Sequence, residues 1–131
     1  MLGARAASRQ KRNSFTSTWD TTQAGSANDT IDLDSAGPFV VGGTYNCKVH
    51  WGDGTSDIIT AYNQAEVTGQ YANTGTYEIR IGGEISGWKF NNGGDDDKII
   101  NISNWGPLVF DALQNYAFYG CSNLDLSLIH I

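Results

Sequence analysis

The stretch that decides the fold is Tyr45-Asn46-Cys47-Lys48-Val49-His50-Trp51, which runs directly into Gly52-Asp53-Gly54-Thr55. Its large apolar side chains fall on alternate positions, and polar residues separate them. Alternate side chains of an extended strand point to opposite faces. The stretch therefore predicts a strand with one buried face, followed by a tight turn.

A second stretch, Tyr77 to Ile81, has the same alternation. Both stretches predict the centre of a core formed between two facing sheets. The side chains that we expect to point inward from these sheets are Tyr45, Cys47, Val49, Trp51, Tyr77, Ile79 and Ile81.

Weaker strand signals occur at intervals of about ten residues along the body of the chain. They are short apolar or β-branched runs bounded by Gly, Asn and Asp. The pattern favours an all-β sandwich or barrel of about seven short strands over an α/β fold. These candidates are Phe15 to Trp19, Thr30 to Leu33, Asp57 to Ala61, Glu66 to Thr68, Ile85 to Phe90 and Lys98 to Ile102.

The pattern changes after Trp105-Gly106-Pro107, where strict alternation stops and a helical turn is expected near Phe110 to Tyr116. We expect a basic tail over residues 1–13, a β-sandwich over 14–106 and a separate module beginning at 107–126. The last residues, 127–131, follow on without a polar cap. They suggest a truncated or foreign terminus, with a genuine final strand as the alternative.

Charge argues against nucleic acid as a partner. The 131 residues carry a net charge of −6, and half of the eight basic residues lie within the first twelve positions. From Asn13 onward, four basic residues face fourteen acidic ones, a balance of −10. A body of this charge repels phosphate backbones. The sequence also lacks the ~20 consecutive apolar residues that span a bilayer, so we expect no membrane insertion by this segment.

Residues suited to catalysis or metal binding are scarce. Cys47 and Cys121 are the only cysteines and form no metal-binding motif, so we expect two separate buried thiols, with a disulfide as the alternative. His50 is expected on a polar strand face, and His130 lies in the doubtful terminus. Asp53 and Asp57 are the carboxylate pair that a glycosidase would need, but the turn favours a structural Asp53.

Two further groups of residues could bind a ligand, and each also has a structural explanation. Asp95, Asp96 and Asp97 are weak candidates for calcium, and we expect a solvated acidic hairpin with no specific site instead. Four aromatic residues, Trp19, Tyr62, Trp88 and Trp105, are candidates for a sugar-stacking platform. Their period-two placement predicts that most of them belong to the core. We expect no cofactor.

The turn and a later segment resemble the paired signature of PKD domains, which are immunoglobulin-like β-sandwiches. In that family a strand ends in Trp-x-x-Gly-Asp-Gly or a close variant, and a later His-x-Tyr and Gly-x-Tyr lead into another core strand. Gly69 stands where the family usually has His. The matching residues here are Trp51, Gly52, Asp53, Gly54, Thr55, Tyr71, Gly75 and Tyr77.

A wider resemblance, to the N-terminal part of BspA-type leucine-rich-repeat surface proteins, covers Phe15 to Leu124. Its most specific part is the single copy of Phe-x-Gly-Cys-x-Asn-Leu formed by Phe118, Gly120, Cys121, Asn123 and Leu124. In those proteins the Phe, Cys and Leu face the interior of the solenoid. The resemblance implies a PKD-type sandwich followed by the first partial repeat.

The sequence thus predicts a non-enzymatic, extracellular or cell-surface module that spaces or presents a repeat array and contacts proteins or glycans. The alternative is a carbohydrate-binding accessory module of a secreted hydrolase, and a hydrolase fragment is a more distant one. An enzyme would require a cluster of catalytic side chains that the sequence does not contain.

Overall fold

The computed structural model describes residues 14–34, 37–109 and 117–125 of the chain. Within these ranges the larger of two sheets has six strands, in the order β4-β3-β6-β1-β7, with β8 paired to β6 beside this path. All of its pairings are antiparallel except β6 with β8. Its strands are β1 (Ser14–Asp20), β3 (Thr44–His50), β4 (Ser56–Ile59), β6 (Thr76–Ser86), β7 (Ile99–Asn104) and β8 (Leu108–Val109).

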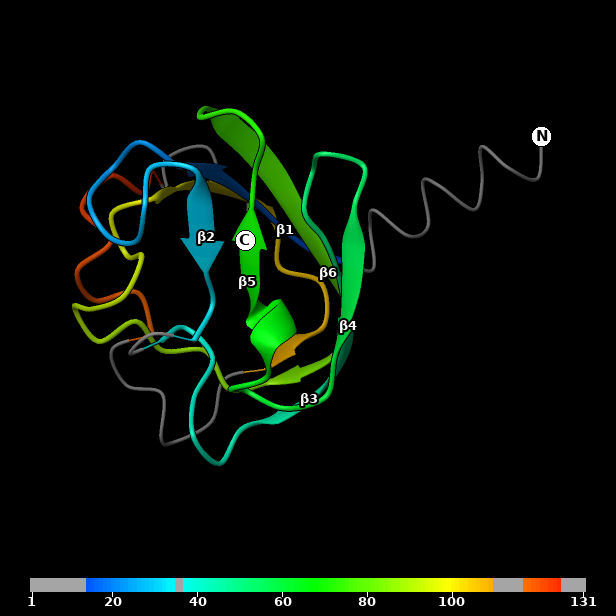
Figure 1. Cartoon of the computed structure of the whole chain (residues 1–131). Helices are drawn as coiled ribbons and strands as arrows, with labels where there is room; N and C mark the ends of the chain where they lie inside the picture. The colour runs from blue at the N-terminus through cyan, green and yellow to red at the C-terminus, as the bar shows by residue number, and fades with distance from the viewer. Residues whose placement is uncertain (1–13, 35–36, 110–116, 126–131) are drawn as a thin grey trace.

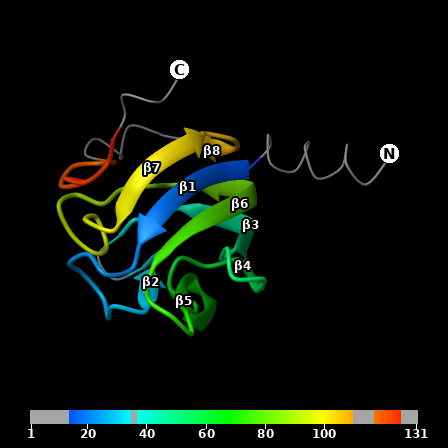
Figure 2. The ribbon, with the colours of Figure 1, turned by 90° about the horizontal axis from the view of Figure 1, so that it is seen from above.

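The smaller sheet pairs β2 (Thr30–Asp32) with β5 (Thr68–Gln70) in antiparallel register. A short 3-10 helix, η1 (Ala65–Val67), leads directly into β5. Figure 1 shows β2 and β5 side by side in front of the larger sheet, and Figure 2 shows the two layers from above. The described part of the chain is therefore a β-sandwich, as the sequence predicted.

Alternating burial explains why the decisive stretch forms a strand. Along β3 the exposed and buried positions alternate from Thr44 to Val49, and Trp51 is buried beyond its end. Six of the seven side chains expected in the core are buried, and Tyr77 is half-buried. One expectation is wrong: β3 and β6 are neighbours in a single sheet, with Val49 opposite Ile81, and do not face each other.

Other strand predictions were correct in position but not always in extent. Glu66 and Val67 belong to η1 and not to a strand, because β5 begins only at Thr68. Residues 87–90 continue from β6 without strand pairing. β8 was not foreseen, and the helical turn expected near Phe110 to Tyr116 lies outside the described residues.

The order of strands in the larger sheet bears on the immunoglobulin-like prediction. In the constant-type immunoglobulin sandwich, the first strand lies in the sheet opposite the C, F and G strands. Here β1 lies between β6 and β7, in the same sheet as β3. The sandwich architecture is established, whereas its immunoglobulin-like identity stays a prediction.

Trp88 is the centre of an aromatic cluster in the core. Its side chain is fully buried, and its ring centroid lies 4.8 Å from that of Phe15 and 5.7 Å from that of Phe90. The rings of Trp19, Phe39 and Phe118 lie within 6.5 Å of it. Edge-to-face pairs of this kind add stability beyond the area that they bury. The cluster joins β1 to the segments on both sides of β7.

The outer edge of β4 is occupied by a side chain from the loop that follows it. The Gln64 amide nitrogen donates a hydrogen bond of 2.8 Å to the carbonyl of Ile58. Its amide oxygen accepts from the backbone N–H of Thr60 at 2.7 Å and of Ala61 at 3.1 Å. Gln64 thus satisfies main-chain groups that a neighbouring strand would otherwise pair.

Replacing Trp51 by Ala should lower the free energy of unfolding by about 3–5 kcal/mol, because a large aromatic side chain is lost from the core. The control is Ile58→Ala, since Ile58 is 64% exposed on the opposite face of the same sheet. That change should cost about 0.5 kcal/mol or less. Urea denaturation measures both. Equal losses for the two variants would contradict the burial of Trp51.

Candidate functional site

The Gly52-to-Thr55 turn is held together by Asp53, as the sequence predicted. One carboxylate oxygen accepts hydrogen bonds from the Thr55 backbone N–H at 3.0 Å and from the Thr55 hydroxyl at 2.6 Å. Burial acts to raise the pKa of Asp53, but the hydrogen bonds from Thr55 outweigh it and lower the pKa. Asp53 is therefore an ionised turn-forming residue.

The second carboxylate of the glycosidase hypothesis also has a structural partner. The indole N–H of Trp51 donates to the Asp57 carboxylate at 2.8 Å. This bond satisfies the one polar atom of a buried indole. Asp53 and Asp57 thus each stabilise a different part of the same strand end, which favours a structural role for both.

Tyr71 and Tyr77 are the two tyrosines in the second part of the PKD-like signature. Their rings stack with centroids 3.9 Å apart. The Tyr71 hydroxyl donates to the carbonyl of Trp51 at 2.7 Å, and that of Tyr77 donates to the carbonyl of Asn73 at 2.7 Å. Both hydroxyls therefore bond back to the main chain. Burial, with smaller contributions from Asp53 and Tyr77, raises the pKa of Tyr71.

Gly69, the departure from the family signature, has a steric cause. A Cβ atom at this position would lie 2.5 Å from the indole ring of Trp51. No real side chain tolerates so short a contact, so a His here would displace the indole. The small sheet approaches the large one closely because residue 69 has no side chain.

The acidic triplet is not the solvated hairpin that we expected. Asp95 is 1% exposed and Asp96 is 8% exposed. The Asp95 carboxylate accepts hydrogen bonds of 2.7 Å from the backbone N–H groups of Ser26 and Asp32 and from the Ser26 hydroxyl. Asp95 thus ties the chain before β7 to both ends of the segment from Ser26 to Asp32, which includes β2.

Lys98 adds a buried positive charge to this arrangement. Its side chain is fully buried, and its ammonium donates to the carbonyls of Ser26, Ala27 and Thr30 at 3.0, 2.7 and 2.8 Å. Burial lowers the pKa of Lys98, while the charges of Asp95, Asp29 and Asp20 oppose that shift. We call Asp95, Lys98 and the residues that they hold, Ser26 to Asp32, the polar clamp. The sequence did not reveal the role of Lys98, because its position three residues after Asp95 was the only sign of one.

Residues 117–125 pack on the sandwich through the repeat-like motif. Phe118 lies between Trp105 and Phe90, with ring centroids 5.7 and 6.2 Å away. Cys121 and Leu124 are half-buried against the same core. The Asn123 amide donates to the carbonyl of Asp97 at 2.8 Å. The three residues expected to face a solenoid interior therefore face the sandwich core.

Main-chain hydrogen bonds fix this segment in place. Phe90 and Asn92 donate to the carbonyls of Ala117 and Tyr119 at 2.9 and 2.6 Å, and Asp125 donates to that of Ile100 at 3.0 Å. A Cβ atom at Gly120 would collide with the Asp96 carboxylate and with the backbone of Asn92. Gly120 also has a φ of +93°, which favours glycine. The module boundary expected near Gly106 stays a prediction.

Both cysteines are free thiols, as expected, but they differ in burial. Cys47 is buried, and this burial raises the pKa of its thiol to about 11. Cys121 is only half-buried, which corrects the expectation for this residue. Burial, with help from the charges of Asp96 and Asp97, raises the pKa of Cys121 to about 12. Both thiols are protonated at neutral pH and poorly reactive.

His50 lies half-buried on the outward face of β3, as predicted. Burial and the nearby positive charges of Arg80 and Lys48 lower its pKa. His50 is therefore mainly neutral at pH 7. His130 lies outside the described residues.

The four aromatic candidates for sugar stacking do not form an exposed platform. Trp19 and Trp88 are fully buried, and Tyr62 and Trp105 are half-buried against the core. The alternation of the sequence had indicated this outcome for most of them.

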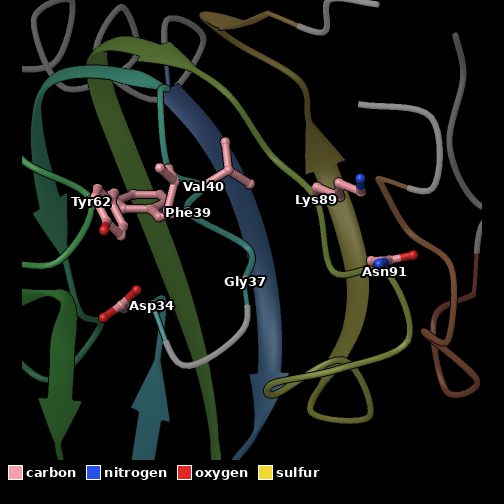
Figure 3. Close-up of a pocket in the computed structure, with 8 residues that line it drawn as sticks. Asp34, Gly37, Phe39, Val40, Tyr62, Lys89 and Asn91 are labelled. Carbon is pink, nitrogen blue, oxygen red and sulfur yellow. The ribbon is translucent and has the colours of Figure 1, made fainter. Parts of the chain in front are cut away.

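An open hollow of about 340 Å³ lies beside Tyr62, between Lys89 and Asn91 on one side and a group of residues before β3 on the other, namely Asp34, Gly37, Phe39, Val40 and Val41. Figure 3 shows Asp34 and the Tyr62 hydroxyl on one side and Lys89 with Asn91 on the other. The polar ends of Lys89 and Asn91 point away from Tyr62. These groups do not converge on one point, so the hollow lacks the geometry that a catalytic site requires.

Within residues 14–34, 37–109 and 117–125, no three His, Cys, Asp or Glu side chains are grouped so that they would hold a metal ion. No helix in the same ranges has the length and apolar character needed to cross a bilayer. Comparisons with family models, with curated proteins and with solved structures gave no match.

Replacing Asp53 by Ala should destabilise the protein by about 1 kcal/mol, because two hydrogen bonds in an exposed turn are lost. This loss corresponds to a decrease in Tm of about 4 °C for a domain of this size. Asp53→Asn keeps the accepting oxygen and should lose less. Thermal unfolding followed by circular dichroism measures both variants. An unchanged Tm in Asp53→Ala would show that the turn does not need this carboxylate.

Ionisation of Asp96 lowers the stability of the folded protein as the pH rises. The ionisation of a carboxylate in an ordinary ion pair has the opposite effect. Burial, followed by the charges of Asp97 and Asp95, raises its pKa in the folded state. The folded state therefore holds the proton more tightly than the unfolded state does. The resulting stability is fully present below the unfolded pKa of 3.8 and is lost as the pH rises through the folded pKa.

Replacing Asp96 by Asn should therefore raise Tm relative to the parent at pH 7, with the gain shrinking as the pH falls toward 3.8. The expected control, Glu84→Gln, changes an exposed carboxylate on β6 and should show no comparable trend. Thermal unfolding across this pH range measures the difference. A gain that is the same at every pH would rule out the ionisation of Asp96 as its cause.

Proposed function

We propose that this chain is a non-catalytic PKD-type module of a BspA-like leucine-rich-repeat protein, and that it presents the repeat array at an extracellular or cell surface. The observation that carries the proposal is the packing of residues 117–125 on the sandwich. A repeat-like segment that is fixed to the sandwich gives the next repeat a defined starting orientation.

Two kinds of contact support a rigid junction. Phe118 inserts into the aromatic cluster around Trp88, which supplies apolar burial. The backbone hydrogen bonds donated by Phe90, Asn92 and Asp125 fix the orientation of residues 117–125 on the sandwich. A flexible spacer would need neither. We therefore infer an architectural role in which the sandwich orients the repeats toward a protein or glycan partner.

The PKD assignment rests on the signature residues and on how they contact one another. Asp53 forms the turn, Trp51 fills the core, and Tyr71 bonds back to Trp51. These contacts give Trp51, Asp53 and Tyr71 a structural role. They support a stable scaffold, and none of them requires a ligand.

Replacing Phe118 by Ala should release residues 117–125 while the sandwich stays folded. Hydrogen exchange should become faster at the amides of Phe90, Asn92 and Asp125, and remain slow at the amides of β3 and β6 that pair the two strands. Tyr119→Ala is the control, because the Tyr119 side chain is 55% exposed.

The same pair of variants in a longer chain with downstream repeats tests the function itself. Small-angle scattering should show one fixed shape for the parent and for Tyr119→Ala, and a broader distribution for Phe118→Ala. A parent that is already as flexible as Phe118→Ala would refute the presenting role. Heat released on titration with neutral oligosaccharides would instead favour the carbohydrate-binding alternative.

A further inference from the structure

Basic side chains are unevenly placed on this acidic protein. In the described part of the chain there are four Lys and Arg residues. Lys98 is buried in the polar clamp and Lys89 lines the hollow. The other two, Lys48 and Arg80, lie on the outward face of the larger sheet, on the neighbouring strands β3 and β6. The two basic residues that remain accessible on the sheet thus share one face.

The register of the strands brings these residues together. His50 is directly opposite Arg80, and Lys48 is directly opposite Gly82. On the other side of Lys48, β4 places Ile58 directly opposite. Cross-strand neighbours of this kind have Cβ atoms about 5 Å apart. Lys48, His50, Arg80 and Ile58 therefore form one continuous patch, which we call the basic face.

The positive charges of the basic face form no direct ion pair within the part of the chain that the structure describes. Among the described residues, none forms a hydrogen bond or ion pair with the side chains of Lys48, His50 or Arg80. Their mutual proximity is unfavourable, and it contributes to the lowered pKa of His50. Glu78 and Glu84 lie on the same face of β6, on either side of the patch, and mark its limits. An incoming carboxylate would relieve this repulsion.

The shape of the patch suits a carboxylate. A Cβ atom added at Gly82 would meet only the Ser14 hydroxyl, at 3.6 Å. No side chain therefore stands at position 82, which lies beside Lys48 and one outward position from Arg80. A carboxylate lying over Gly82 would be within reach of both positive charges.

Ile58 decides the class of partner. It is 64% exposed and is one of the few large apolar side chains exposed in the described ranges. An aliphatic side chain next to two cations fits an apolar residue flanked by carboxylates, whereas a sugar ring is bound best by an exposed aromatic face.

We propose that the basic face binds an acidic segment of a partner protein, with an apolar residue on Ile58 and carboxylates on Lys48 and Arg80. The segment lies across the face and does not extend the sheet, because Gln64 already bonds to the carbonyl of Ile58 at the β4 edge. This contact goes beyond the presenting role and does not depend on the packing of residues 117–125.

The probe for the test is a short capped peptide with one leucine between paired glutamates, titrated into the isotope-labelled full chain. Saturable NMR shifts are expected at Lys48, His50, Ile58 and Arg80. Lys48→Gln and Arg80→Gln should each weaken binding about two- to fivefold. The matched control is Lys89→Gln, which should bind the peptide like the parent. Added salt should weaken binding in the parent.

Several results would overturn the proposal. One is equal binding of a peptide in which glutamine replaces glutamate, and another is a shift map centred elsewhere. Unchanged affinity in both Lys48→Gln and Arg80→Gln, with Tm also unchanged, would exclude the basic face. Tighter binding of a polyuronate or of single-stranded DNA would assign the face to another class of partner. Self-association without peptide that these variants abolish would assign it to a second copy.

Discussion

The polar clamp is the interaction on which the arrangement of the two sheets depends. Asp95 and Lys98 are three residues apart in the turn before β7, and both reach the segment from Ser26 to Asp32 that forms β2. Removing one member of a buried charged pair leaves the other uncompensated, which typically costs about 3–5 kcal/mol. Here the two charges are also satisfied by backbone groups, so each holds the loop conformation directly. The clamp joins the small sheet to the turn that leads into β7 of the large one.

The same turn also connects the sandwich to the segment that follows it. Asp96 contacts Gly120, and the carbonyl of Asp97 accepts a hydrogen bond from Asn123. Consecutive residues of the acidic triplet therefore serve different neighbours: Asp95 faces β2, and the next two face residues 117–125. The like charges still repel each other in the folded protein, because the charges of Asp97 and Asp95 help to raise the pKa of Asp96.

Much of the fold was predictable because burial of one sheet face leaves a period of two in the sequence. Tyr45, Cys47 and Val49 followed that rule, and the Asp53 turn followed from the known behaviour of Asp beside Gly. What the sequence could not reveal was pairing. Adjacent and facing strands have the same alternation, so β3 and β6 were wrongly expected in different sheets. The burial of Asp95 and Lys98 was also hidden, because their partners lie 63 to 72 positions earlier in the chain. Gly69 was read as a defect in a signature, although the indole of Trp51 requires it.

Gln64 has a consequence for the behaviour of the protein in a crowded setting. The strand beside it contains the Ile58-Ile59 pair, and unprotected edges of this composition recruit further strands and begin fibrillar aggregation. A single amide side chain occupies the hydrogen-bonding groups through which such growth would start. Many copies of this module held close together would then remain separate, and this resistance depends on one neutral residue that contributes nothing to the core.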